Sequence, residues 1–216
     1  MVIMGIDPGL ANTGWGIVET RGPVCRARAY GCISTPASEQ LDRRLGRIYA
    51  EISDAIQAYQ PSQLAIEKIF FGENSRSAIA TAHARGAAIV ACARAGLEVG
   101  EYTPMQIKQA VVGTGSADKY QVIYMVRTLL ALDHDPRPDH CADALAAAVC
   151  HANLTRTRHI VQDGASVQVL EQLEAQAEAD REEARQVTAA ATAAHVAGAR
   201  GASGMGRSRQ SRRNSQ

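Results

Sequence analysis

The sequence predicts an α/β fold in which a mixed five-stranded sheet carries helices on both faces. Two observations predict it. Strand-like segments come first in close succession and then alternate with helical segments, in the order βββαβαβααα, which implies an antiparallel hairpin series continued by parallel strands. In addition, hydrophobic residues make up 46% of the 216 positions, which is enough to fill a core between such layers.

The first part of the chain carries three predicted strands and a helix. Residues 2–7, 15–20 and 24–34 have strand-like patterns, and the turn chemistry of "PGLANTG" separates the first two. We expect these strands to form an antiparallel meander. Residues 38–59 follow with apolar side chains at helical spacing. These are Leu41, Leu45, Ile48, Ile52 and Ile56.

The middle of the chain alternates strands and helices. "QLAIEKI" (63–69) predicts a buried strand, an alanine-rich helix follows from Ser75 to about Arg94, and "LEVGEY" (97–102) predicts the fifth strand. Thr103-Pro104 favours the start of a short helix. Ser116 predicts the start of another helix, and Pro138 and Asp139 precede a last one over about 140–153.

Bulk composition bounds the class of protein. No uninterrupted apolar run of about 18 residues is present, which argues against a membrane span. The N-terminus has no basic region before an apolar stretch, so it predicts a strand and not a signal peptide. Five cysteines without a Cys-x-x-Cys pair indicate reduced thiols in a cytoplasmic protein. A net charge of +1 means that any nucleic-acid footprint must be local.

The C-terminal part differs in composition from the rest. We expect residues 1–156 to form the folded domain and residues 157–216 to be a largely disordered tail, rich first in Ala and Glu and then in Arg. Five arginines and no acidic residue follow position 199: Arg200, Arg207, Arg209, Arg212 and Arg213. We expect this end to add salt-sensitive DNA affinity.

Three carboxylates stand where strands and a helix begin or end. Asp7 ends the first strand, Glu67 ends the fourth, and Asp143 lies in the first turns of the last helix. If strands one and four are neighbours, these acids meet, and divalent cations such as Mg²⁺ or Mn²⁺ would relieve their repulsion. Asp7 and Glu67 alone also have ordinary explanations, since Asp before Pro-Gly is common in turns and apolar strands often end in a charge.

The stretch "RPDHCADAL" (137–145) offers four possible metal-binding side chains. Cys141 lies about 200° around the helix from Asp143, so it is a poor co-ligand, and the cysteines are expected in the core. Asp139 and His140 both flank the face of Asp143. Asp139 follows Pro138 and suits a helix N-cap that accepts from the amides at 141 or 142.

Four segments together resemble the RuvC family of Holliday-junction resolvases. They are "MGIDPGLANTGWGIV", "LAIEKIFFGENSRSAIATAHARGA", "IKQAVVGTGSADKYQV" and "HCADALAAAVCHA", in order between residue 1 and about residue 154. The resemblance implies a ribonuclease H-like fold and a homodimer. It also implies cleavage of four-way DNA junctions with two Mg²⁺ or Mn²⁺ ions per site, leaving 5′-phosphate and 3′-hydroxyl ends.

The resemblance assigns site roles residue by residue. Asp7 would bridge both metal ions, while Glu67 and Asp143 hold one each or share them. The fourth family position falls on His140, where some members have aspartate, so His140 would supply a nitrogen ligand or position the attacking water. The histidine favours Mn²⁺ more than an all-oxygen site would, and we expect Mn²⁺ to support activity at least as well as Mg²⁺.

The resemblance also implies contacts with DNA and protein partners. Phe70 would stack on unpaired bases at the crossover, and Lys108 and Lys119 match basic positions that flank the site. Asn74 and Arg76 are further DNA-binding candidates. The small-residue helix that begins near Ser75 would form the dimer interface, and a branch-migration motor complex is an implied partner.

Three other functions compete with a junction nuclease. "GIDPGLANTG" also resembles the phosphate loop of actin-like and sugar-kinase ATPases, but these need two such domains. A second alternative is a junction-binding module without chemistry, and a third is another ribonuclease H-like nuclease that acts on hybrids or duplex DNA.

Overall fold

The computed structural model describes residues 1–69 and 75–164. Five strands are present in this part of the chain: β1 (Val2–Asp7), β2 (Asn12–Arg21), β3 (Val24–Ser34), β4 (Gln63–Glu67) and β5 (Glu98–Tyr102). Five helices accompany them: α1 (Leu41–Tyr59), α2 (Ser75–Arg94), α3 (Pro104–Val112), α4 (Lys119–Leu130) and α5 (Asp139–Gly164). The order of elements is the predicted one.

The strands form one mixed sheet in the order β3-β2-β1-β4-β5. β1, β2 and β3 pair antiparallel, which confirms the predicted meander. β4 pairs parallel with β1 and β5 pairs parallel with β4. Parallel neighbours bring their carboxyl ends to the same edge of a sheet, so the ends of β1, β4 and β5 meet there.

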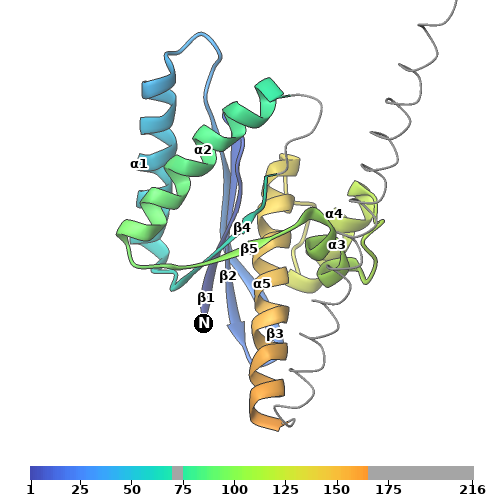
Figure 1. The fold of residues 1–216 in the computed structure, drawn as a ribbon. Helices are drawn as coiled ribbons and strands as arrows, with labels where there is room; N and C mark the ends of the chain where they lie inside the picture. Colours follow the sequence, from blue (N-terminus) through green and yellow to red (C-terminus); the bar gives the residue numbers. More distant parts are fainter. Residues whose placement is uncertain (70–74, 165–216) are drawn as a thin grey trace, which may run out of the picture. The chain divides into compact units, whose positions relative to one another are not determined.

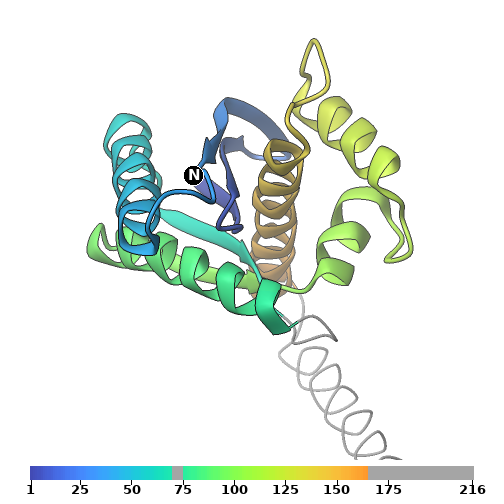
Figure 2. The same ribbon diagram turned by 90° about the horizontal axis from the view of Figure 1, so that it is seen from above.

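Helices cover both faces of this sheet, as expected for the predicted α/β class. α1 and α2 lie over one face, and α5, with α3 and α4 beside it, lies over the other (Figure 1, Figure 2). Each face has its own hydrophobic core. The α1/α2 core contains Ile6, Ile52 and Leu64, whereas the α5 core contains Ile3 and Ala65. Successive side chains of a strand therefore point to different cores.

Capping explains where α3 and α4 begin. At Thr103 a capping box forms with Gln106, and Pro104 occupies the first helical turn, as the sequence predicts. α4 starts at Lys119 and not at Ser116, so that expected start is wrong. Asp118 accepts the amide of Gln121 at 2.9 Å in a second capping box, and the Ser116 hydroxyl instead lies 3.0 Å from that of Thr114.

Several element bounds differ from the expected ones. β2 is longer than predicted, because its pairing with β1 and β3 extends from Asn12 to Arg21. α1 begins at Leu41 and not at 38, and β4 ends at Glu67. α5 continues to Gly164, well beyond the expected end near 153.

The C-terminal predictions fall largely beyond this description. Residues 165–216 lie outside the described residues, so the expected disorder and the arginine-rich segment stay predictions, as does the domain boundary at 156. No helix in the described part of the chain is long and apolar enough to cross a membrane.

Candidate metal centre

Strand alternation directs two of the predicted acids to the α5 face of the sheet. Ile3 belongs to the α5 core, and two further steps of two along β1 lead to Asp7. In the same way Ala65 belongs to the α5 core, and Glu67 follows it by two on β4. Since β1 and β4 are parallel neighbours, both carboxylates leave the sheet at the same edge and on the same side.

Two glycines, Gly5 on β1 and Gly14 on β2, allow the backbone of α5 to come very close to the sheet. A Cβ at Gly5 would lie 1.9 Å from the carbonyl oxygen of Ala144, and one at Gly14 would lie 2.0 Å from that of His140. Any side chain would force the helix away, because both contacts are with backbone atoms. Gly14 pairs directly with Asp7 across β1 and β2, so the close approach occurs beside the predicted site.

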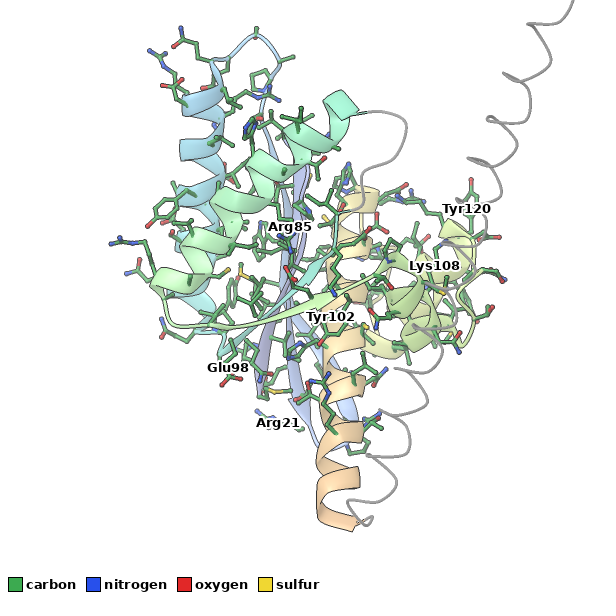
Figure 3. The ribbon with its side chains drawn as sticks, viewed as in Figure 1. Arg21, Arg85, Glu98, Tyr102, Lys108 and Tyr120 are labelled. Carbon is green, nitrogen blue, oxygen red and sulfur yellow. The ribbon has the colours of Figure 1, made fainter. Side chains whose placement is uncertain are left out.

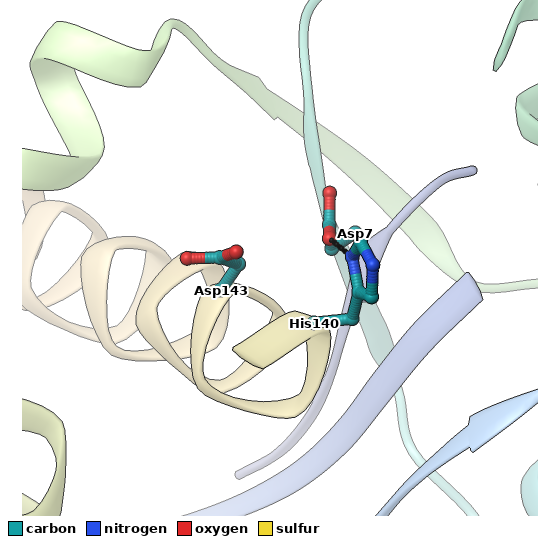
Figure 4. A group of neighbouring side chains, drawn as sticks. All are labelled: Asp7, His140 and Asp143. Carbon is teal, nitrogen blue, oxygen red and sulfur yellow. Dashed lines mark hydrogen bonds and ion pairs between the residues drawn. The ribbon is translucent and has the colours of Figure 1, made fainter. Parts of the chain in front are cut away.

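The N-terminal turn of α5 places two side chains against Asp7 (Figure 4). His140 Nδ1 lies 2.7 Å from Asp7 Oδ2. Asp143 follows His140 by three positions and therefore lies on the same side of the helix. One potential ligand atom from each of Asp7, His140 and Asp143 falls within 4.8 Å of the others, and each residue is partly buried.

Burial and like charge raise two carboxyl pKa values at this edge. Burial raises the pKa of Asp7; the hydrogen bond from His140 opposes this, and the charge of Asp143 adds to it. Glu67 lies outside the 4.8 Å group but close to it. Burial, with the charges of Asp7 and Asp143, raises the pKa of Glu67 to about 7, while Lys108 acts in the opposite direction.

The donor set suits a divalent cation. Carboxylate oxygens from Asp7 and Asp143 converge with an imidazole nitrogen, and Glu67 is near enough to feel both charges. A cation at this place would remove the repulsion that raises the carboxyl pKa values. A set of oxygen ligands with one nitrogen suits Mg²⁺ and Mn²⁺, whereas structural zinc sites are usually rich in thiolates.

Lys119 and Lys108, predicted from the sequence, both lie beside this group. Lys119 Nζ is 3.1 Å from Asp143 Oδ2 and 3.4 Å from Asp139 Oδ2. Partial burial alone would lower the pKa of Lys119, but the hydrogen bond and the charge of Asp143, with the charge of Asp139, raise it. Lys108 lies on α3, close enough to lower the pKa of Glu67.

Asp139 does not cap α5, so that prediction is wrong. It lies inside the first turn, and its carboxylate accepts a hydrogen bond from Arg137 Nη1 at 2.7 Å. The amide of Cys141, one of its expected partners, donates to the carbonyl of Pro138 at 2.8 Å. The guanidinium two residues earlier and the ammonium of Lys119 are charged partners, and these outcompete a neutral amide for a carboxylate.

The cysteines of α5 lie in the core, as predicted. Cys141 is 1% exposed and Cys150 is fully buried, and burial raises the pKa of both thiols, to about 11 and about 12. Neither thiol belongs to the group around Asp7. Cys141 and Cys150 are therefore not candidate ligands of this centre, whereas His140 of the same helix is one.

Three predicted DNA-binding residues cannot be placed. Phe70 and Asn74 lie outside the described residues, and so does the side chain of Arg76.

The structure also contains residues that the sequence did not indicate. They are Gly5 and Gly14, which allow the close approach of α5, and Arg85, which donates a hydrogen bond to the backbone carbonyl of Glu67. The glycines have a weak sequence signal, since both stand on strands near Asp7. Arg85 is 18 residues from Glu67 and has none.

Comparison with known proteins decides the family. The family model described as "Crossover junction endodeoxyribonuclease RuvC" matches residues 3–151, which include all four predicted acidic-site positions. The chain belongs to the RuvC family. Membership in this family of nucleases makes the chain an enzyme and implies the use of divalent metal ions.

Individual RuvC proteins match over most of their length. The crossover junction endodeoxyribonuclease RuvC of Moorella thermoacetica is 52% identical over 158 residues, which are 73% of this chain and 95% of that protein. The RuvC of Rubrobacter xylanophilus is 50% identical over 70% of this chain and 84% of its own. A solved structure of T. thermophilus RuvC in complex with Holliday junction substrate is similar, with 40% identity and a TM-score of 0.70. It covers 73% of this chain and 96% of that one.

Proposed function

We propose that this chain is a structure-selective endonuclease that resolves four-way DNA junctions by paired, symmetric nicks. The observation that carries the proposal is the meeting of Asp7, His140 and Asp143 within 4.8 Å, with Glu67 beside them, in a chain that matches the RuvC model. The products would carry 5′-phosphate and 3′-hydroxyl ends. Recombination and repair are the processes that such a reaction serves.

The residues divide the work according to their positions. Asp7 is the central ligand, because its side chain is less exposed than that of Asp143 and contacts His140 directly. Asp143 and Glu67 flank it from α5 and β4. His140 either supplies a nitrogen ligand or orients the attacking water, and its Nδ1 contact with Oδ2 restricts the orientation of the Asp7 carboxylate. Two bound divalent ions would supply charge neutralisation at the attacking and leaving oxygens.

Lys119 has a role that changes when cations bind. In the absence of metal its ammonium neutralises part of the charge on Asp143 and Asp139. Asp143 would lose this partner if it held a divalent ion, and Lys119 would then be able to contact a DNA phosphate next to the site. Lys108 flanks the site from α3 near Glu67 and would contact the backbone in the same way.

The remaining contacts follow from family membership and stay proposals. Phe70 would stack on bases at the crossover, with Asn74 and Arg76 as polar contacts nearby. Two related active sites on a junction with two-fold symmetry require a C2 homodimer, and α2 is the proposed interface. A branch-migration motor is the proposed protein partner, and the cytoplasm the proposed location.

A substrate comparison tests the function. We would measure nicking of a labelled synthetic four-way junction, a linear duplex and an RNA–DNA hybrid, each with Mn²⁺. We expect paired nicks in the junction alone, lost in Asp7→Asn. Asp54→Asn, on the exposed side of α1, is the matched control and should cut normally. Binding of the junction without nicking would favour a binding module, and preferred cleavage of the hybrid would favour another ribonuclease H-like activity.

The choice of metal and the roles of neighbouring residues need separate measurements. Cleavage rates should be at least as high in Mn²⁺ as in Mg²⁺, and a much lower rate in Mn²⁺ would contradict a nitrogen ligand. His140→Ala should abolish most cleavage, whereas Asp139→Ala should retain it, because Asp139 faces Arg137 and Lys119. The opposite result would exchange the roles of these two residues.

A further inference from the structure

The peptide group between Glu67 and Lys68 is held at both of its polar atoms. The carbonyl oxygen of Glu67 accepts a hydrogen bond from Arg85 Nε at 3.2 Å. The amide of Lys68 donates to the carbonyl of Tyr102 at 2.8 Å. This peptide follows directly on the last residue of β4, so its orientation sets the direction in which the chain leaves the sheet.

Arg85 supplies a hydrogen-bond donor at a position where β1 no longer pairs with β4. The pairing of β1 with β4 ends at Ile6 and Ile66, one residue before Glu67. A backbone carbonyl at such a position needs another donor when it is partly buried. Arg85 provides it from α2, a helix that is separated from β4 by the segment 68–74 and returns across the sheet.

Packing fixes the position of Arg85. Its neighbour Ala84 is fully buried in the α1/α2 core, as is Ala88 one turn later, so this part of α2 cannot slide along the sheet. The Arg85 side chain, labelled in Figure 3, is only 18% exposed. Its Nη2 atom pairs with the carboxylate of Glu101 on β5. One guanidinium therefore joins α2 to the ends of two adjacent strands.

Arg85 acts on the backbone of Glu67 and from the side opposite to the metal centre. The Glu67 side chain points to the α5 face, together with Tyr102, its register partner on β5. Arg85 approaches from the α2 face, on which strand alternation also places Glu101. The guanidinium thus leaves the carboxylate available for a cation while it holds the peptide plane that carries it.

We propose that Arg85 is a positioning residue for Glu67. By holding the backbone at Glu67, Arg85 fixes this carboxylate in the orientation that it needs as the metal ligand from β4. The inference rests on the proposed function, because it takes Glu67 as a metal ligand. Residues that orient ligands from behind typically change metal affinity or activity by about 10- to 100-fold when they are removed.

The test compares Arg85→Met with Glu101→Gln. Arg85→Met removes the bond to the Glu67 carbonyl and the ion pair together, whereas Glu101→Gln weakens the ion pair and keeps the bond. We expect Arg85→Met to weaken Mn²⁺ binding by the DNA-free protein, measured by calorimetry, about tenfold. The cleavage rate at saturating junction should fall in parallel, with unchanged junction affinity in EDTA. Glu101→Gln should retain both values.

Two further measurements separate positioning from general stability. The Lys68 amide should exchange with deuterium faster in Arg85→Met than in Glu101→Gln, because only the former frees its peptide group. Arg85→Lys keeps a donor and should recover part of the Mn²⁺ affinity. Equal losses of melting temperature in both variants with unchanged Mn²⁺ affinity would overturn the proposal and leave Arg85 a structural residue.

Glu67→Gln distinguishes this inference from the function on which it rests. If Glu67→Gln binds Mn²⁺ and cuts the junction as the parent does, the assignment of Glu67 as a ligand fails. If Glu67→Gln loses both while Arg85→Met keeps both, only the positioning role of Arg85 fails.

Discussion

The two faces of the sheet are built from different kinds of residue. The α1/α2 face is filled by large aliphatic side chains, among them Ile6, Ile48 and Ile52, all fully buried. On the α5 face, glycines of β1 and β2 meet the backbone of a helix whose inner residues are mostly alanine. The first face keeps helices at an ordinary side-chain distance, and the second brings a helix backbone onto the strands.

This difference shows why the candidate metal centre lies on the α5 face. Short side chains such as Asp reach only a few ångströms, so ligands from a strand and a helix meet only where the two backbones are close. Gly5 and Gly14 create that closeness next to Asp7. The α1/α2 face can supply stability but cannot bring carboxylates of different elements together in this way.

The largest expected effect comes from adding one carbon atom to a glycine on the α5 face. Gly14→Ala would place a Cβ 2.0 Å from the His140 carbonyl, so the start of α5 must move. A displacement of about 1 Å at a catalytic group can cost about 100-fold in rate. We expect the cleavage rate on a labelled junction to fall by about that factor or more, with weaker Mn²⁺ binding.

The matched control is Gly46→Ala on α1. A Cβ there meets nothing within 4 Å, and alanine in a helix is more favourable than glycine by about 1 kcal/mol. This variant should be slightly more stable and should cut normally. If Gly14→Ala also cut at the parental rate, close approach of α5 would not be what positions His140.

The second expected effect concerns the α1/α2 face of the sheet. Ile52→Ala removes a fully buried side chain, and such changes cost about 2–5 kcal/mol of unfolding free energy. Urea unfolding should show this loss. Below the melting temperature, however, the single-turnover cleavage rate should stay near the parental value, because the α5 face is untouched. A large loss of rate in the folded variant would show that the two faces are not separable.

The third expected effect is a pH dependence set by Glu67. In the metal-free protein the pKa of Glu67 is raised to about 7 by burial and by Asp7 and Asp143, with Lys108 opposing. The folded state therefore binds this proton more tightly than the unfolded state, and stability should fall as the pH rises from about 4.5 to about 7. The raised pKa of Asp7 acts with the same sign.

Metal binding should depend on the same proton in the opposite direction. A cation requires the ionised carboxylate, so Mn²⁺ affinity should fall about tenfold per pH unit below pH 7. Calorimetry at pH values from about 5.5 to about 8 measures this slope. Glu67→Gln removes one titrating ligand and should flatten both dependences, while Asp54→Asn should leave them unchanged. A slope that Glu67→Gln does not alter would assign it to another group.

The sequence predicted most of the fold because its signals are local. Alternation of apolar residues marked the strands, helical spacing marked α1, and Pro104 marked the start of α3. Local competition caused the errors. Asp118 forms a better cap than Ser116, and Asp139 finds charged partners in place of backbone amides. Such contests depend on exact geometry, which spacing alone does not provide.

The sequence by itself determined that Asp7 and Glu67 end strands, that His140 and Asp143 share one helix face, and that Cys141 lies on the far side of that helix. Only the tertiary structure decided that these groups meet, because β1 and β4 become neighbours across 60 positions of chain and α5 returns from the far end to lie on glycine. It alone placed Arg85 behind Glu67. Contacts between distant segments depend on how whole elements pack, and no local pattern records them.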